Sequence, residues 1–85
     1  MSDDKLRNLR DKLDKIDVEI QSLLTQRAQV SLEVKKVKQT DQAKLKPGRE
    51  AQILRALIKR HNGHFPKFEL IRIWREILSA SLQLQ

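Results

Sequence analysis

The 85-residue sequence contains no cysteine and no tyrosine, and it has only two glycines and two prolines. Without cysteine the chain can form neither a disulfide framework nor a thiol nucleophile. The scarcity of glycine and proline, with little clustering of β-branched residues, favours helices over strands. A chain this short cannot bury two independent cores. We therefore predict an all-α protein with one domain over residues 1–85.

Several functional signatures are also missing. No apolar run approaches the roughly 20 residues that a membrane-spanning helix needs, and residues 1–5 do not resemble a secretory signal. The sequence has no glycine-rich phosphate loop. His61 and His64 lack the companion residues of a metal site or a catalytic triad. We expect a cytoplasmic protein with no metal and no membrane partner.

Charge is plentiful and unbalanced. Eighteen lysines and arginines against eleven acidic residues give a net charge of +7, which implies an anionic partner. Nucleic acid is the usual partner of a small basic protein, but here the basic residues are not gathered in one run. Interspersed charges are typical of a solvated helix face, so we expect no nucleic-acid partner. The first predicted helix carries acidic residues at Asp11, Asp14, Asp17 and Glu19.

Apolar periodicity predicts three helices. The first covers residues 5–39, which contain no glycine or proline, and a polar loop over residues 40–46 follows it. Pro47 suits the first turn of the second helix. Asn62-Gly63 is predicted to close that helix as a left-handed cap, and Pro66 opens the third helix.

The length of the first helix decides the architecture. At about 1.5 Å per residue it forms a rod of roughly 50 Å. A globule of this many residues has a radius of gyration of only about 12 Å. Since one chain cannot cover such a rod, we predict an intertwined antiparallel helical homodimer with two-fold symmetry.

One charged residue interrupts the apolar face of the first helix. Arg27 stands at a position where the three-and-four spacing calls for an apolar side chain. A buried guanidinium needs an anion, because an uncompensated buried charge costs several kcal/mol. The anion is either an internal carboxylate or a negatively charged ligand, and the other polar residues favour the ligand. The apolar stripe consists of Leu6, Leu9, Leu13, Ile16, Ile20, Leu23, Val30, Val34 and Val37.

Other polar residues of the first helix share this face. Ser31 and Lys38, with the apolar Val34 between them, follow Arg27 at steps of four, three and four residues. Arg27 and Lys38 therefore point the same way, about three turns apart. Arg10 lies 17 residues before Arg27, which is roughly 25 Å along the axis. Only the Arg10 of a partner chain could reach the same small ligand.

The other two helices supply further polar groups. In the third helix, Ser81 and Gln85 continue the apolar face of Leu78 and offer neutral hydrogen-bonding groups beside a cationic site. At the start of the second helix, Arg49 and Glu50 add a cation and a carboxylate. No residue is persuasive alone, but the set as a whole predicts a site for an anionic ligand.

Together these residues resemble the all-helical chorismate mutase family, over nearly the whole chain. The resemblance implies an interlocked homodimer with two sites, each completed by the partner subunit's Arg10. It also implies conversion of chorismate to prephenate in aromatic amino acid biosynthesis, without a cofactor. The matching segments are Leu9-Arg10 with Ile16-Asp17, Leu23-Leu24 with Arg27, Val34 with Lys38, Arg49-Glu50, Ser81 and Gln85.

The resemblance also implies a role for each polar residue. Arg27 and Arg10 of the partner subunit would hold the two carboxylates of the substrate in the compact shape that reacts. Lys38 and Gln85 would stabilise the negative charge that develops on the ether oxygen. The remaining roles are a hydrogen bond from the ring hydroxyl to Glu50, and support of a carboxylate by Ser81 and Arg49.

Three alternatives remain. Isochorismate pyruvate lyase is a sister activity on the same fold that also uses clustered cations, although the Arg49-Glu50 pair argues against it. A basic helical protein that binds nucleic acid is the non-enzymatic alternative, but it gives no reason for Arg27 to interrupt the stripe. In the third, Arg27 forms an internal ion pair that sets the register of a helical interaction module.

Overall fold

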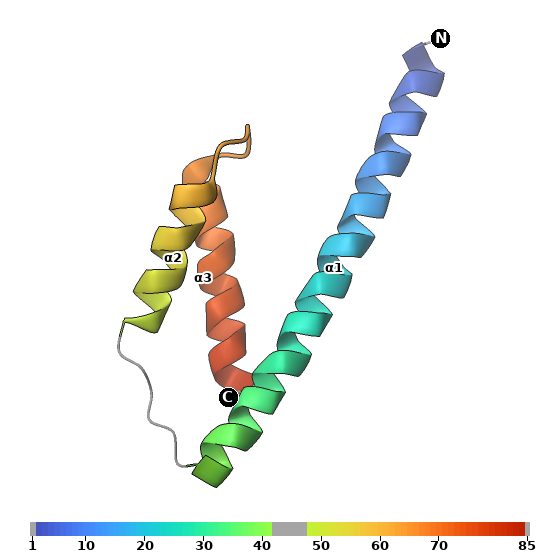
Figure 1. The fold of residues 1–85 in the computed structure, drawn as a ribbon. Coiled ribbons are helices and arrows are strands. Elements are labelled where there is room, and N and C mark those ends of the chain that lie inside the picture. The colour runs from blue at the N-terminus through green and yellow to red at the C-terminus, as the bar shows by residue number, and fades with distance from the viewer. Residues whose placement is uncertain (1, 42–47, 85) are drawn as a thin grey trace. The chain divides into compact units, whose positions relative to one another are not determined.

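The computed structural model describes residues 2–41 and 48–84, with side chains over residues 2–37 and 48–84. These residues form three helices and no strand: α1 (Ser2–Asp41), α2 (Arg49–Arg60) and α3 (Lys67–Leu84) (Figure 1). The predicted all-α fold with one long first helix is confirmed. No helix in this part of the chain combines the length and apolarity of a membrane span.

Helix α1 is longer at both ends than the sequence predicted. Its 40 residues give a length of roughly 60 Å. Thr40 and Asp41, predicted as the start of a loop, are its last two residues. Polarity alone does not stop a helix, because neither residue lacks an amide hydrogen or has the conformational freedom of glycine. The rest of the predicted loop and Pro47 lie outside the described residues.

Helix α2 begins after a glycine in the left-handed conformation. Gly48 has φ 81° and ψ 0°, and its carbonyl accepts a hydrogen bond from the amide of Gln52 at 2.9 Å. A residue with a Cβ is strained at this φ, so the position favours glycine. The first turn of α2 therefore starts at Arg49, which places the predicted Arg49-Glu50 pair at the amino end of the helix.

The predicted left-handed cap at Asn62-Gly63 is wrong. Helix α2 ends at Arg60, and His61 follows with extended φ −75° and ψ 120°. The amide of His61 donates to the carbonyl of Ile58 at 3.2 Å. Gly63 does not have a positive φ. An extended residue thus ends the helix directly, and the conformational freedom of Gly63 is not used there.

Helix α3 begins directly after Pro66, as predicted. The Pro66 carbonyl accepts a hydrogen bond from the amide of Leu70 at 3.0 Å, which closes the first turn. Proline serves here because its missing amide hydrogen would have no partner at a helix start. Glu69 in this turn lies near the positive end of the helix dipole and forms an ion pair with Arg72 at 3.4 Å.

The chain divides into two units, Met1–Val30 and Ser31–Gln85. In the second unit, α2 and α3 contact each other. Leu57 of α2 and Leu78 of α3 are its buried apolar residues, 5% and 7% exposed. These two helices therefore hold a small core of their own. Eight further residues between 48 and 84 are half-buried: Ile53, Leu54, His61, Leu70, Ile71, Trp74, Ile77 and Leu84.

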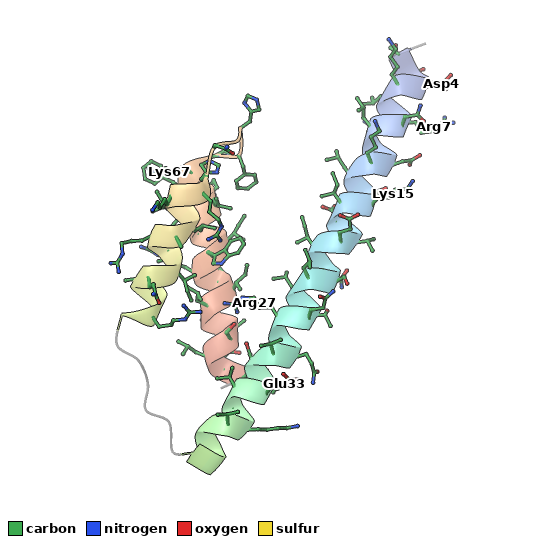
Figure 2. The ribbon with its side chains drawn as sticks, viewed as in Figure 1. Asp4, Arg7, Lys15, Arg27, Glu33 and Lys67 are labelled. Carbon is green, nitrogen blue, oxygen red and sulfur yellow. The ribbon has the colours of Figure 1, made fainter. Side chains whose placement is uncertain are left out.

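The first unit is a segment of α1 with an uncovered apolar face. No residue from 2 to 26 is buried or even half-buried. Leu13 is 59% exposed, Ile16 49% and Leu23 61%. The side chains along this segment extend outward from the ribbon (Figure 2). A contiguous apolar face of this length is typical of an interaction surface rather than of a free monomer surface. The homodimer stays a prediction that this exposure motivates.

Candidate active site

Burial on α1 centres on a short stretch around the arginine of the apolar stripe. Among the side chains described for this helix, over residues 2–37, only Arg27, Ala28 and Ser31 are not exposed. Arg27 is half-buried, and Ser31 is only 5% exposed. The charge that interrupts the stripe is thus partly withdrawn from water. An anion interacts with a cation more strongly in such a position than in bulk water.

Ser81 of α3 is the second buried hydroxyl of the described chain, 8% exposed. Leu78 is buried one turn earlier, so the predicted continuation of the apolar face to Ser81 is confirmed. The Ser81 Oγ donates a hydrogen bond to the carbonyl of Ile77 at 3.0 Å. In this conformation the hydroxyl proton is engaged by the Ile77 carbonyl. Donation to a carboxylate requires the hydroxyl to turn away from Ile77.

Arg49 and Glu50 both lie in the exposed first turn of α2. The Nη1 atom of Arg49 donates to the Oε1 atom of Gln52 at 3.1 Å. Because Gln52 is neutral, this hydrogen bond orients the guanidinium without neutralising it. The positive charge therefore remains available to an anion. Glu50 is the acidic residue of this turn, a position that the helix dipole favours.

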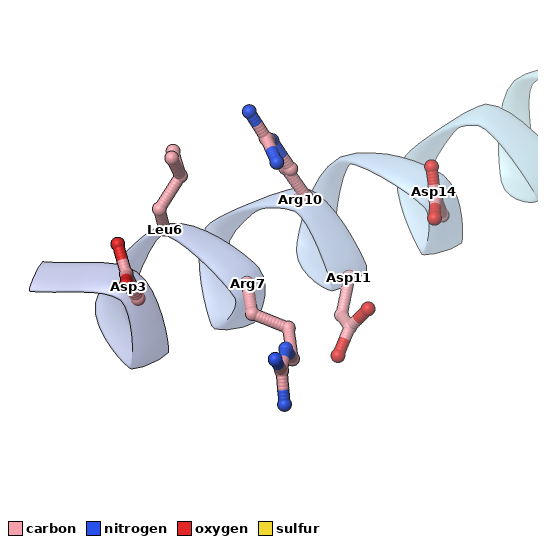
Figure 3. Close-up of a pocket in the computed structure, with 6 residues that line it drawn as sticks. All are labelled: Asp3, Leu6, Arg7, Arg10, Asp11 and Asp14. Carbon is pink, nitrogen blue, oxygen red and sulfur yellow. The ribbon is translucent and has the colours of Figure 1, made fainter.

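Arg10 lines a shallow hollow of about 460 Å³ on the first turns of α1 (Figure 3). All of its lining residues are exposed and come from this one helix, so it encloses nothing. Leu6 and Arg10 project from one side of the helix, whereas Arg7 and Asp11 project from the other. Since Leu6 belongs to the apolar stripe, Arg10 extends beside that stripe and would reach a molecule docked on it.

The predicted site residues divide between the two units. Arg10 and Arg27 belong to the first unit. Lys38 lies in α1, but its side chain falls outside the described part of the structure, as does Gln85. The convergence of all seven residues on one ligand stays a prediction. The remaining three belong to the second unit: Arg49, Glu50 and Ser81.

Ser31 is the buried polar residue to which the sequence did not assign a role. The pattern placed it among the candidate ligand groups on the face of Arg27 and Lys38, but gave it no part in the reaction. Its spacing of four residues from Arg27 was the available signal.

Within residues 2–41 and 48–84, no three histidine, aspartate or glutamate side chains lie together where they could hold a metal ion.

Comparisons with known proteins agree with these features. Residues 9–85 match the family model of chorismate mutase type II. The chain is 33% identical, over 96% of its length, to the bifunctional chorismate mutase/prephenate dehydratase of Stutzerimonas stutzeri and also to that of Aquifex aeolicus (strain VF5). It is 34% identical over 89% of its length to the Neisseria gonorrhoeae protein of the same name. The chain spans 24%, 24% and 21% of the lengths of these relatives.

Proposed function

The chain belongs to the chorismate mutase type II family, and on this basis we propose that it converts chorismate to prephenate. The observation that carries the proposal is the half-buried Arg27 on an otherwise apolar helix face. A cation in that position fits a small anionic substrate held between helices. The prephenate dehydratase named in the relatives is not part of the proposal, because the match to the family covers chorismate mutase alone.

The reaction suits a site made of charged and hydrogen-bonding side chains. The ether C–O bond of chorismate breaks as a C–C bond forms within the same molecule, so no nucleophile or proton relay is needed. Catalysis then comes from holding a reactive conformer and stabilising the charge that develops. Arg27 and the partner subunit's Arg10 hold the two carboxylates, which keeps the reacting carbons close together. No cofactor takes part.

Negative charge develops on the ether oxygen as the C–O bond breaks. Lys38 and the amide of Gln85 stabilise this charge in the transition state more than in the ground state. The position of Lys38 supports this role, because it lies on α1 eleven residues after Arg27. That spacing is about three turns, so both side chains leave the helix in the same direction.

The start of α2 and the end of α3 contribute the remaining contacts. Glu50 accepts a hydrogen bond from the ring hydroxyl of the substrate. Arg49 supports a carboxylate, and its uncompensated guanidinium beside Gln52 favours that role. Ser81 binds the same end of the substrate with its hydroxyl turned away from the Ile77 carbonyl.

A homodimer completes the proposed site. The apolar stripe of α1 is exposed over residues 2–26, and Arg10 extends beside it. A second copy of the chain is the occupant that fits, because an antiparallel pairing of two identical stripes covers both of them. The same pairing carries each Arg10 toward the other chain's Arg27. Light scattering should give twice the 10.0 kDa mass of one chain; a monomer at micromolar concentration would contradict the pairing.

The test of the activity is to incubate the purified chain with chorismate and identify the product by NMR. Loss of the chorismate ultraviolet absorbance with formation of prephenate supports the mutase. Release of pyruvate from isochorismate, with chorismate untouched, would support the lyase instead. If neither compound reacts with a verified dimer, the proposal fails, and salt-dependent binding of nucleic acid becomes the next property to measure.

A further inference from the structure

The buried residues in the described part of the chain include an unusually high share of polar side chains. Only four residues there are buried, and two of these are serines rather than apolar residues. Ser81 belongs to the proposed site, but Ser31 has no part in the mechanism above. A buried hydroxyl needs a hydrogen-bond partner, because leaving one unsatisfied costs about 1–3 kcal/mol. The partner of Ser31 is therefore informative.

The helix itself does not satisfy this hydroxyl. Thr25 donates to the carbonyl of Gln21 at 3.1 Å, and Ser81 donates to that of Ile77 at 3.0 Å. These are the usual bonds of a hydroxyl to the preceding helical turn. For Ser31, no hydrogen bond to any described residue is present.

The Ser31 hydroxyl is nevertheless not sealed off. In the described part of the chain, no fully enclosed side-chain oxygen or nitrogen lacks a partner. The unpartnered Oγ of Ser31 therefore keeps a small accessible area, although the residue as a whole is 5% exposed. A hydroxyl oxygen that is mostly buried has lost most of its hydration, but a ligand can still contact it. Such a hydroxyl can form a specific hydrogen bond to a bound ligand.

We propose that Ser31 is an additional substrate-binding residue, whose hydroxyl donates a hydrogen bond to a carboxylate of the substrate. The inference rests on the proposed function. Ser31 follows Arg27 by one helical turn and precedes Lys38 by two turns, so it lies between the two cations along the helix. Its hydroxyl adds a donor to the carboxylate that Arg27 holds, without adding a further positive charge.

The test compares the steady-state kinetics of Ser31→Ala with those of the parent chain. Alanine keeps the Cβ and the helix, so only the hydroxyl is lost. We expect KM to rise about ten- to 150-fold, the range for one hydrogen bond to a charged group, with kcat within about twofold. Thr25→Ala is the matched control, because it removes an exposed hydroxyl that already has a backbone partner on the same helix.

A second measurement separates binding from folding. Titration calorimetry with prephenate should show the same loss of affinity in Ser31→Ala, with an unchanged thermal midpoint and dimer mass. An unchanged KM overturns the role of Ser31 and leaves the mutase intact. A lowered thermal midpoint with unchanged prephenate affinity also overturns it, since the hydroxyl is then structural. A parent chain that neither binds prephenate nor consumes chorismate overturns the proposed function, and this inference with it.

Discussion

Two inactive variants should restore each other if each site takes residues from both chains. Arg10 and Lys38 lie 28 residues apart on the continuous helix α1, which is about 42 Å along its axis. A molecule the size of chorismate cannot touch both within one chain. We expect Arg10→Ala, which removes a cation that holds a carboxylate, to lower the rate by about a hundredfold to a thousandfold. Lys38→Ala should lower it by a similar factor, because it removes a donor that stabilises the developing charge.

Mixing the two variants creates one intact site. In a heterodimer, the Arg10→Ala chain supplies Lys38, and the Lys38→Ala chain supplies Arg10 to that same site. The other site then lacks both residues. Unfolding and refolding an equal mixture makes about half of the dimers heterodimers, each with one working site of two. The mixture should recover about a quarter of the parent rate of chorismate consumption.

A matched control excludes nonspecific rescue. Arg27 and Lys38 are assigned to the same chain in each site, so a mixture of Arg27→Ala and Lys38→Ala should recover nothing. If the mixture of Arg10→Ala and Lys38→Ala is no more active than its separate parts, the shared site is refuted. Equal recovery in both mixtures would refute the assignment of Arg27 and Lys38 to one chain.

Two further predictions concern stability and assembly. Gly48→Ala should lower the unfolding free energy by about 1 kcal/mol because φ is 81° there, although nothing lies within 4 Å of an added Cβ. Gly63→Ala should leave the thermal midpoint unchanged or raise it slightly. If both variants were destabilised equally, the assignment of a left-handed φ to Gly48 and not to Gly63 would be contradicted. Leu13→Glu should yield a monomer. Burying Leu13, which is 59% exposed in one chain, contributes at most about 1.5–3 kcal/mol per chain to the free energy of dimer formation. Burying a charged glutamate at the same position would instead oppose dimer formation. Ser22→Glu on the opposite, exposed face should remain dimeric by light scattering, and a dimeric Leu13→Glu would place the interface elsewhere.

Periodicity was sufficient to predict the helices but not all of their ends. The spacing of apolar residues located α1, α2 and α3, because burial of one face recurs with the helical turn. The end of α1 was placed too early, since Thr40 and Asp41 are polar yet compatible with a helix. The two glycines could not be distinguished from sequence, because either one can adopt a left-handed φ. Only the backbone shows that Gly48 uses this freedom and Gly63 does not.

The candidate site shows the same division between pattern and burial. The sequence identified Arg27 because a charge in an apolar stripe is conspicuous, and its half-buried state agrees with that interpretation. It placed Ser31 on the right face without giving it a role, because spacing does not report how much water a side chain loses. Burial of Ser31 to 5% depends on tertiary packing, which no local pattern contains.

The most direct test of the central claim is the chorismate mutase rate of Arg27→Leu beside that of the parent chain. Leucine continues the apolar stripe, so we expect the dimer mass and the helix content to be retained. The rate should fall by about thirtyfold or more, because removing one partner of a desolvated charge pair costs about 2–5 kcal/mol. An Arg27→Leu dimer that converts chorismate to prephenate at the parent rate would contradict the claim that Arg27 holds the substrate.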